Sequence, residues 1–412
     1  MRISIKHKFF DSILLLLLIF SSGGLLFVFH RNIMSLVLFF LSIFLLIFTG
    51  KQIKKNIFNN HFFIFLFLLL LFGINYFFSV GSQSIIKYAF HLLNIVSCIF
   101  VLIHFSNNRD LRYFQKRIRF VLKIILYFSL VNFFSYIFLK NFLTTLYPSP
   151  DKTLQTFYNL FFYDTERSSL SFLGIDFVRN QGWFWEPGIN QIYLNILLYL
   201  EGFVFKQNKK VIILIILAIL TTYSTTGVLI MLILLFFMFQ KLIKTSPILM
   251  LLAFSTLIPF YYIAKNNVEE KIETFSFQKR YFDLIQTISI AKDYPITGIG
   301  LDDTYFSEFR TDYFIDNNFR ESFEESTNLE LIAKSTDKGS SNSVTFLMAA
   351  MGMPIAFLLL LCLFKQQLFT HRKGIFMIIV MMSVISEPLL LRPFFLLLII
   401  SGLGTLIKRF IK

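Results

Sequence analysis

The sequence predicts an all-α membrane protein, a polytopic transmembrane helical bundle of about 12 spans. Three observations support this fold class. First, 56% of the 412 residues are hydrophobic and only 15% are charged, whereas soluble domains average about 25% charged residues. Second, apolar runs reach or approach the roughly 20 residues that a helix needs to cross the hydrocarbon layer. Third, positive charge is concentrated in alternate connections between these runs.

The apolar runs locate the expected spans. The run after the basic N-terminus continues past Gly23 and Gly24 without a small-residue cleavage site, so we expect an uncleaved first span. The polar segment 221–227 divides a long apolar stretch into two short spans. The expected spans lie near residues 11–29, 33–49, 60–79, 85–105, 120–139, 184–205, 209–222, 226–240, 247–264, 342–364, 374–390 and 393–408.

Charge distribution gives the expected orientation. With the N-terminus in the cytoplasm, the inner segments hold 23 Lys and Arg against 3 Asp and Glu, and the outer segments hold 16 against 21. Every inner loop follows the positive-inside rule, and a missed span would reverse the bias downstream. We therefore expect both termini in the cytoplasm. The net charge of +15 reflects topology and contact with anionic membrane lipid, and no nucleic acid is expected as a partner.

The chain divides into five expected regions. Two outer loops are enlarged, and we expect short helices in both. These loops are residues 140–183 and 265–341, and the spans fall in residues 1–139, 184–264 and 342–412. We expect the functional site to lie in these loops, because long connections are often functional.

Several kinds of chemistry find no support in the sequence. The spans carry almost no charge in their middles, where an ionisable group usually marks an ion or proton path. Cys98 and Cys362 lie in apolar runs, which suits buried thiols rather than a disulfide. Phosphate-loop and zinc motifs are absent from the sequence, so no cofactor and no metal site are expected.

The first candidate cluster is the segment 178–191. Arg179 precedes Trp183 and Trp185, the only tryptophans of the chain. Glu186 and Pro187 then open a helix, since Pro suits the first turn and an acid there complements the helix dipole. An aromatic belt at the membrane interface with a capped helix explains the tryptophans and Glu186 equally well, but it does not explain Arg179.

The second candidate cluster is the segment 279–303. Arg280 begins an amphipathic helix with apolar residues on one face, and a turn at residues 295–300 ends it. Gly298 and Gly300 allow the backbone to approach a neighbour closely, and Asp302 follows them. A plain turn with solvated acids is the alternative.

Two more clusters lie at outer helix ends. Asn342 caps a helix start, and Gly352 lies deep in the span that follows, where it could mark a simple kink. Glu387 and Arg392 lie in a short outer turn. Arg392 could pair with Glu387 or face the functional site.

At these clusters the chain resembles the O-antigen ligase and Wzy-type polysaccharide polymerase superfamily of bacterial surface glycan assembly. Members are polytopic, with two enlarged outer loops. The matches cover residues 175–355 and stand in the family's order. The matching segments are Arg179 with Gly182 and Glu186-Pro187, the turn 221–227, Arg280 with Pro295, Gly298 and Gly300, and Ser341-Asn342 with Gly352.

Two departures from the family pattern favour a polymerase over a ligase. The ligases carry His where this chain has Ser341, and neither large outer loop contains a His. The Arg often found in the family's counterpart of the turn 221–227 is replaced by Thr225 and Thr226. A ligase that transfers glycan to lipid A core or protein is one alternative. A lipid-linked oligosaccharide flippase or transporter is another, disfavoured by the charge-poor spans.

The resemblance implies a metal-independent, inverting glycosyltransferase. It would join glycan repeat units carried on undecaprenyl diphosphate into O-antigen, capsule or exopolysaccharide. The reaction would take place on the outer face of the bacterial inner membrane, in some systems beside a chain-length regulator protein. Arginine binds phosphate through a bidentate fork and stays charged, so Arg179 and Arg280 are expected to stabilise the leaving diphosphate, with Arg392 in support. Glu186 or Asp302 would act as general base. Asn342, Trp183, Trp185, Gly298 and Gly300 complete the expected substrate-binding set.

Overall fold

The computed structural model describes residues 5–48, 53–108, 110–149, 152–165, 169–172, 175–205, 208–245, 275–314, 324–325 and 340–410. The expected span at 247–264 lies outside them. The described helices are α1 (Ile5–Phe20), α2 (Leu25–Phe29), α3 (Arg31–Phe48), α4 (Lys55–Phe78), α5 (Ile85–Asn108), α6 (Leu111–Leu139), α7 (Pro187–Tyr199), α8 (Lys209–Thr221), α9 (Thr225–Thr245), α11 (Phe275–Asp293), α12 (Asp303–Phe314), α14 (Ser343–Met351), α15 (Met353–Phe364), α16 (Lys373–Ser386) and α17 (Pro393–Phe410).

The structure has the helical, multi-pass character that the apolar runs predict. Four described helices are long and apolar enough to cross a bilayer, namely Arg31–Phe48, Lys55–Phe78, Ile85–Asn107 and Leu111–Phe142. Shorter apolar helices are Thr225–Gln240, Met353–Phe364, Lys373–Ser386 and Pro393–Ile407. The expected number of twelve spans is not confirmed, because several apolar runs form short or interrupted helices.

The first expected span, 11–29, is interrupted. α1 ends at Phe20, and α2 begins at Leu25. Between them Gly23 adopts φ 137°, a conformation that glycine reaches without strain. The interruption is held by the first outer loop, because the Leu25 N–H donates to Trp183 O at 2.8 Å and the Trp185 N–H donates to Gly23 O at 3.1 Å. The segment of the expected span 11–29 therefore consists of two helices, and distant backbone groups satisfy the turn between them.

The first outer loop contains strands where short helices were expected. After one 3₁₀ turn (Lys140–Phe142), β1 (Thr144–Ser149), β2 (Lys152–Phe157) and β3 (Phe161–Tyr163) form an antiparallel sheet in the order β1-β2-β3. β4 (Ser169–Phe172) pairs with β5 (Ile175–Val178) as a hairpin. The segment is rich in Thr, Tyr and Phe, which favour strands, and this correction follows from that local composition. The second loop is helical as expected, with α11 and α12.

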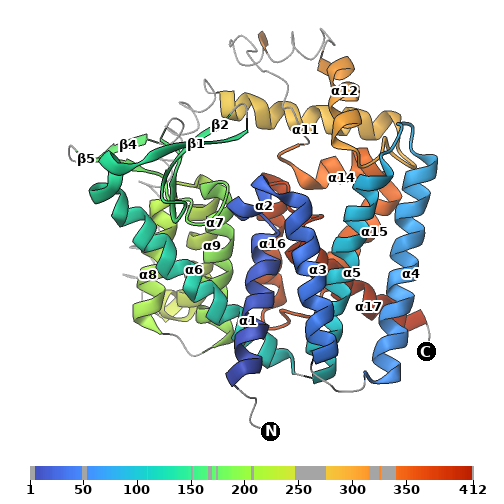
Figure 1. The fold of residues 1–412 in the computed structure, drawn as a ribbon, viewed down its shortest axis with the longest axis horizontal. Coiled ribbons are helices and arrows are strands. Elements are labelled where there is room, and N and C mark those ends of the chain that lie inside the picture. Colours follow the sequence, from blue (N-terminus) through green and yellow to red (C-terminus); the bar gives the residue numbers. More distant parts are fainter. Residues whose placement is uncertain are drawn as a thin grey trace.

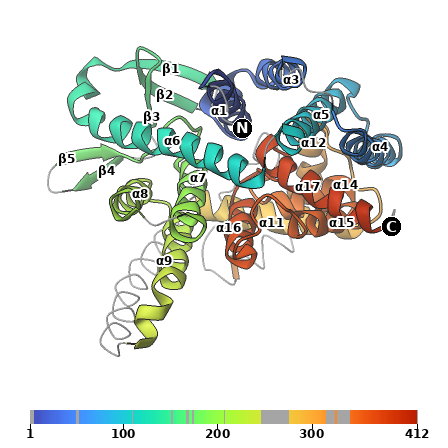
Figure 2. The same ribbon diagram turned by 90° about the horizontal axis from the view of Figure 1, so that it is seen from below.

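The outer-loop elements lie together at one end of the molecule. Figure 1 shows β1–β5, α11 and α12 at the top, and both termini in the lower half. Seen from below in Figure 2, α3, α4 and α5 stand on one side and α7, α8 and α9 on the other. α1 contacts both α3 and α6 and so links the two sides.

Gly352 breaks the expected span 342–364 into α14 and α15, with φ 80°. The loop 295–300 fills the break, since Pro295 O accepts a hydrogen bond from the Met353 N–H at 2.8 Å. Asn75 of α4 donates its side-chain amide to a carbonyl of this loop at 2.8 Å and to a carbonyl of α14 at 2.9 Å. These bonds satisfy the backbone groups that a helix end leaves unpaired. The break is therefore stabilised by hydrogen bonds from α4 and from the loop 295–300.

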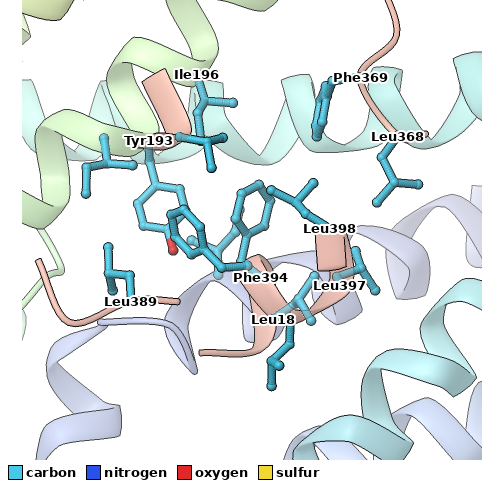
Figure 3. Packing of buried hydrophobic residues seen from close by; sticks show 14 of the residues in the cluster. Leu18, Tyr193, Ile196, Leu368, Phe369, Leu389, Phe394, Leu397 and Leu398 are labelled. Atoms are coloured by element: carbon cyan, nitrogen blue, oxygen red, sulfur yellow. The ribbon is translucent and has the colours of Figure 1, made fainter. Parts of the chain in front are cut away.

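The core lies where α1, α7 and α17 meet. Tyr193 of α7, Leu18 of α1 and Phe394 of α17 are buried there, and Figure 3 shows them with side chains from the α15–α16 connection. Tyr193 and Phe394 pack edge to face, with ring centroids 5.6 Å apart. Burying such rings removes large apolar areas from water or lipid contact. The core thereby fixes the outer ends of α7 and α17, which carry candidate site residues.

Candidate functional site

Arg179 follows β5 and is held against the turn between α8 and α9. Its Nε donates to Thr222 O at 3.1 Å, and its Nη2 donates to Tyr223 O at 3.3 Å. The neighbouring Asn180 adds a bond from Nδ2 to Thr221 Oγ1 at 2.9 Å. Two segments predicted separately, 178–191 and 221–227, are thus joined. Arg179 also occupies the turn whose family counterpart often supplies an arginine of its own.

Arg280 and Glu387 meet at the outer end of the bundle. Arg280 Nη2 lies 3.9 Å from Glu387 Oε1, and the two side chains are 49% and 7% exposed. Glu387 also lies beside the first turn of α7, where a Cβ on Gly188 would clash with its Oε1. The turn that carries Glu387 is fixed by Ser343, whose Oγ donates to Glu387 O at 2.5 Å. Four elements, α7, α11, α14 and the α16–α17 turn, therefore converge here.

The electrostatics tie Arg179 to this group. Burial lowers the pKa of Arg179, the nearby Arg280 lowers it further, and the carboxylates of Glu186, Glu387 and Asp164 raise it. The arginine remains charged, because a guanidinium group is not deprotonated in proteins. We call Arg179, Arg280, Glu186 and Glu387 the arginine cluster. It combines two guanidinium groups that can bind phosphate with two carboxylates that can accept a proton.

The two tryptophans and Asn342 have packing roles in the structure. Trp183 stacks on Phe128 with centroids 3.8 Å apart and meets Phe20 edge to face. Trp185 packs against the small core under β2 and β3. Asn342 caps α14 as predicted, since its Oδ1 accepts from two backbone N–H groups at 3.0 and 3.2 Å. Sugar or substrate contact by these residues stays a prediction.

Gly298 and Gly300 approach protein backbone and side chains closely. Both have positive φ, 67° and 98°. A Cβ on Gly298 would lie 2.5 Å from Ala349 O, and the Gly300 N–H donates to Ala350 O at 2.8 Å. The close approach that the glycines predict is therefore made to the end of α14. Their expected part in substrate binding remains untested.

Asp302 lies apart from the arginine cluster. Its carboxylate accepts hydrogen bonds from Lys87 Nζ, from the Thr304 N–H at 2.9 Å and from the Ser84 N–H at 3.3 Å. Burial alone would raise its pKa, but these bonds outweigh burial and lower it. A carboxylate so engaged is a weak proton acceptor, which disfavours the expected base role of Asp302.

Arg392 also lies apart from the arginine cluster and does not pair with Glu387. Its guanidinium carbon sits 4.8 Å from the centroid of the Phe27 ring. Burial and, to a smaller extent, the nearby Arg31 lower its pKa to about 10, against the opposing effect of Asp303. The predicted site residues thus divide into two groups on the same end of the bundle.

Sequence reasoning did not assign Glu387 to the site with Arg280. It left open whether Arg392 pairs with Glu387 or faces the functional site. The signal was available, since Glu387-Pro388 repeats the Glu-Pro dipeptide of Glu186-Pro187 at a helix boundary. In the described residues there is no group of three or more His, Cys, Asp or Glu arranged to hold a metal ion.

Residues 211–360 match the family model described as O-antigen ligase. The match runs from α8 to α15 and includes the second outer loop. It confirms the resemblance to the O-antigen ligase and Wzy superfamily. Arg280, Asp302 and Asn342 lie inside it, whereas Arg179 and Arg392 lie outside. A search of curated proteins finds no match. The chain is thus a multi-pass membrane protein that is similar, over residues 211–360, to the O-antigen ligase family.

Proposed function

We propose that this protein is a polymerase that joins undecaprenyl-diphosphate-linked repeat units into a surface polysaccharide on the outer face of the bacterial inner membrane. The observation that carries the proposal is the convergence of Arg179 and Arg280 with Glu186 and Glu387. Two guanidinium groups from different loops would bind one diphosphate in bidentate fashion. The family match to residues 211–360 supports glycan assembly as the context.

The proposed glycan transfer needs no group other than the two substrates and the side chains of this protein. An acceptor hydroxyl attacks the anomeric carbon of the donor glycan from the face opposite the diphosphate, which inverts the configuration. The new C–O bond forms as the bond to the diphosphate breaks, and the diphosphate leaves with the electron pair. Glu387 or Glu186 accepts the hydroxyl proton. Because negative charge grows on the leaving oxygen, Arg179 and Arg280 stabilise the transition state more than the ground state.

A specific observation favours polymerase over ligase. At the position where ligases carry His, the Ser341 backbone N–H donates to Asp283 Oδ2 at 2.9 Å, and the hydroxyl offers no base near neutral pH. A ligase remains the second candidate, because the matching family model is described as O-antigen ligase.

The charge pattern supports the orientation. Inner connections are basic in the sequence, and the strands and α11 lie together at one end of the bundle (Figure 1). Arg179 directly follows β5, and Arg280 belongs to α11 and contacts Glu387. The proposed orientation puts the arginine cluster at the outer lipid headgroups, where a lipid-linked diphosphate would lie. A chain-length regulator would meet the protein at the same face.

Gene deletion and complementation test the proposal. Loss of a polymerase leaves single repeat units on the lipid anchor, and loss of a ligase leaves none there while long carrier-linked chains accumulate. Loss of a flippase instead traps repeat units on the inner face. Complementation with Arg280→Ala or Glu387→Gln should fail to restore the chain-length ladder. If both variants restore the full chain-length ladder, the proposed site is wrong.

A further inference from the structure

A second group of cations lies at the same end of the bundle as the arginine cluster. Arg31 is the first residue of α3, and Arg392 precedes α17. Both guanidinium groups face the ring of Phe27, with carbon-to-centroid distances of 5.9 and 4.8 Å. Two like charges beside one aromatic ring repel each other, and the carboxylate of Asp303 opposes this repulsion at both arginines. We call Arg31, Arg392 and Phe27 the Phe27 site.

The charges around the Phe27 site are incompletely matched. Lys87 pairs with Asp302, and Arg31 reaches Asp303 only at 3.8 Å, with both side chains about two-fifths exposed. Among the described residues, no acceptor lies within hydrogen-bond distance of the half-buried Arg392 guanidinium. A guanidinium has five N–H donors, and leaving them unpaired in a half-buried place is costly.

An arginine at the opposite end of the bundle provides a contrast. Arg119 bonds the buried Glu201 through Nε and Nη2, both at 2.7 Å. Lys123 adds a third contact to that carboxylate at 3.0 Å. Arg119 is therefore held by a bidentate acceptor of the protein itself. Arg392 lies on an aromatic ring and finds no such acceptor in the part of the chain that the structure describes, so its N–H donors are available to an anionic ligand.

The Phe27 site and the arginine cluster flank one turn. Residues 387–392 carry Glu387 to the arginine cluster and Arg392 to the Phe27 site. The second outer loop also contributes to both places. Its helix α11 supplies Arg280 to the arginine cluster, and its helix α12 begins at Asp303 beside the Phe27 site. Two lipid headgroups bound at these groups would lie on either side of the turn.

We propose that the Phe27 site is a second binding site for a phosphate-bearing lipid headgroup, and that its ligand is the diphosphate of a second carrier-linked glycan. The assignment rests on the proposed polymerase function, in which donor and acceptor both carry this diphosphate. Arg31 and Arg392 bind the phosphate oxygens in place of the missing acceptor. The acceptor glycan is thereby tethered next to the donor, which raises its effective concentration at the reacting carbon.

Counting bound lipid tests the second site. The full-length protein is reconstituted in phosphatidylcholine nanodiscs, undecaprenyl diphosphate is added, and bound copies are counted by native mass spectrometry. Wild type should bind two copies, and Arg31→Ala/Arg392→Ala should bind one. Arg31→Lys/Arg392→Lys keeps the charges and guards against misfolding, and its second binding event should be at least tenfold weaker because lysine lacks the fork. Arg372→Ala removes another arginine, 5.3 Å from the Phe203 centroid, and should still bind two.

The outcomes separate the second site from the proposed function. Two copies on the Arg31→Ala/Arg392→Ala variant, or a single copy on wild type that only Arg179→Ala/Arg280→Ala removes, would overturn the second site and leave the polymerase standing. Two copies on Arg179→Ala/Arg280→Ala would overturn the arginine cluster instead. Replacing phosphatidylcholine with phosphatidylglycerol should leave both events intact. If it abolishes the Arg392-dependent event, the site binds bulk phospholipid and the acceptor assignment is wrong.

Discussion

Arg280→Ala separates catalysis from folding more cleanly than any other change in the arginine cluster. The Arg280 side chain is half exposed, and its contact with Glu387 is 3.9 Å long. Exposed ion pairs contribute about 0.2–1 kcal/mol to stability, so the thermal midpoint of the variant should fall by about 2 °C or less. Arg179 is a poorer choice, because its removal leaves two backbone carbonyls without their donor.

The expected loss of activity is much larger than the loss of stability. Removing one donor that stabilises a developing oxyanion costs about 10²–10³ in rate, or about 2.7–4 kcal/mol. The assay is polymer formation by the purified protein in nanodiscs with a carrier-linked repeat unit, followed as a chain-length ladder over time. Arg280→Lys should fall between wild type and Arg280→Ala, since it keeps the charge without the fork.

Lys292→Ala is the matched control, because Lys292 is an exposed cation near the other end of the same helix. It should leave the rate within about twofold of wild type. The reasoning is refuted if Arg280→Ala retains more than about a third of the wild-type rate, or if Lys292→Ala loses as much activity as Arg280→Ala.

Three further predictions concern stability. Gly352→Ala should lower the free energy of unfolding by about 1–3 kcal/mol through backbone strain at φ 80° alone, and a thermal melt that matches wild type would contradict this. Glu201→Gln should lower the free energy of unfolding by about 2 kcal/mol. This is less than the about 3–5 kcal/mol of a fully buried ion pair, because Arg119 is a quarter exposed. A thermal melt identical to that of wild type would contradict this prediction. Asp302 has a folded pKa below its unfolded value, so its ionised form stabilises the fold at neutral pH, and this contribution is lost as pH falls through the folded pKa. The destabilisation by Asp302→Asn should therefore be full at pH 6 and shrink towards pH 3, whereas a pH-independent difference would show that ionisation of Asp302 does not stabilise the fold.

Local sequence signals predicted several elements correctly. The polar segment 221–227 does separate α8 from α9, because clustered Thr and Ser with a Gly interrupt an apolar helix. The amphipathic pattern after Arg280 lies in α11, and Asn342 caps α14. Each of these depends on residues within one or two turns of one another, so a single sequence contains the whole cause.

Other predictions failed or stayed untested because their causes lie far away in the chain. Trp183 and Trp185 hold open the break after α1, although more than 150 residues separate them from it. Gly298 and Gly300 are close-approach glycines as expected, but only the fold shows that their neighbours are α14 and Gln83.

The sequence by itself determined that this chain is an apolar, multi-helix membrane protein whose ionisable residues gather at helix ends, because solvent preference and helix capping are local properties. Only the tertiary structure decided how those residues are grouped. It brought Arg280 to Glu387 across 107 positions, and it separated Asp302 and Arg392 from them, because the shared turn at residues 387–392 presents its two ends to different neighbours. Charge pairing over such separations depends on packing, which no local pattern contains.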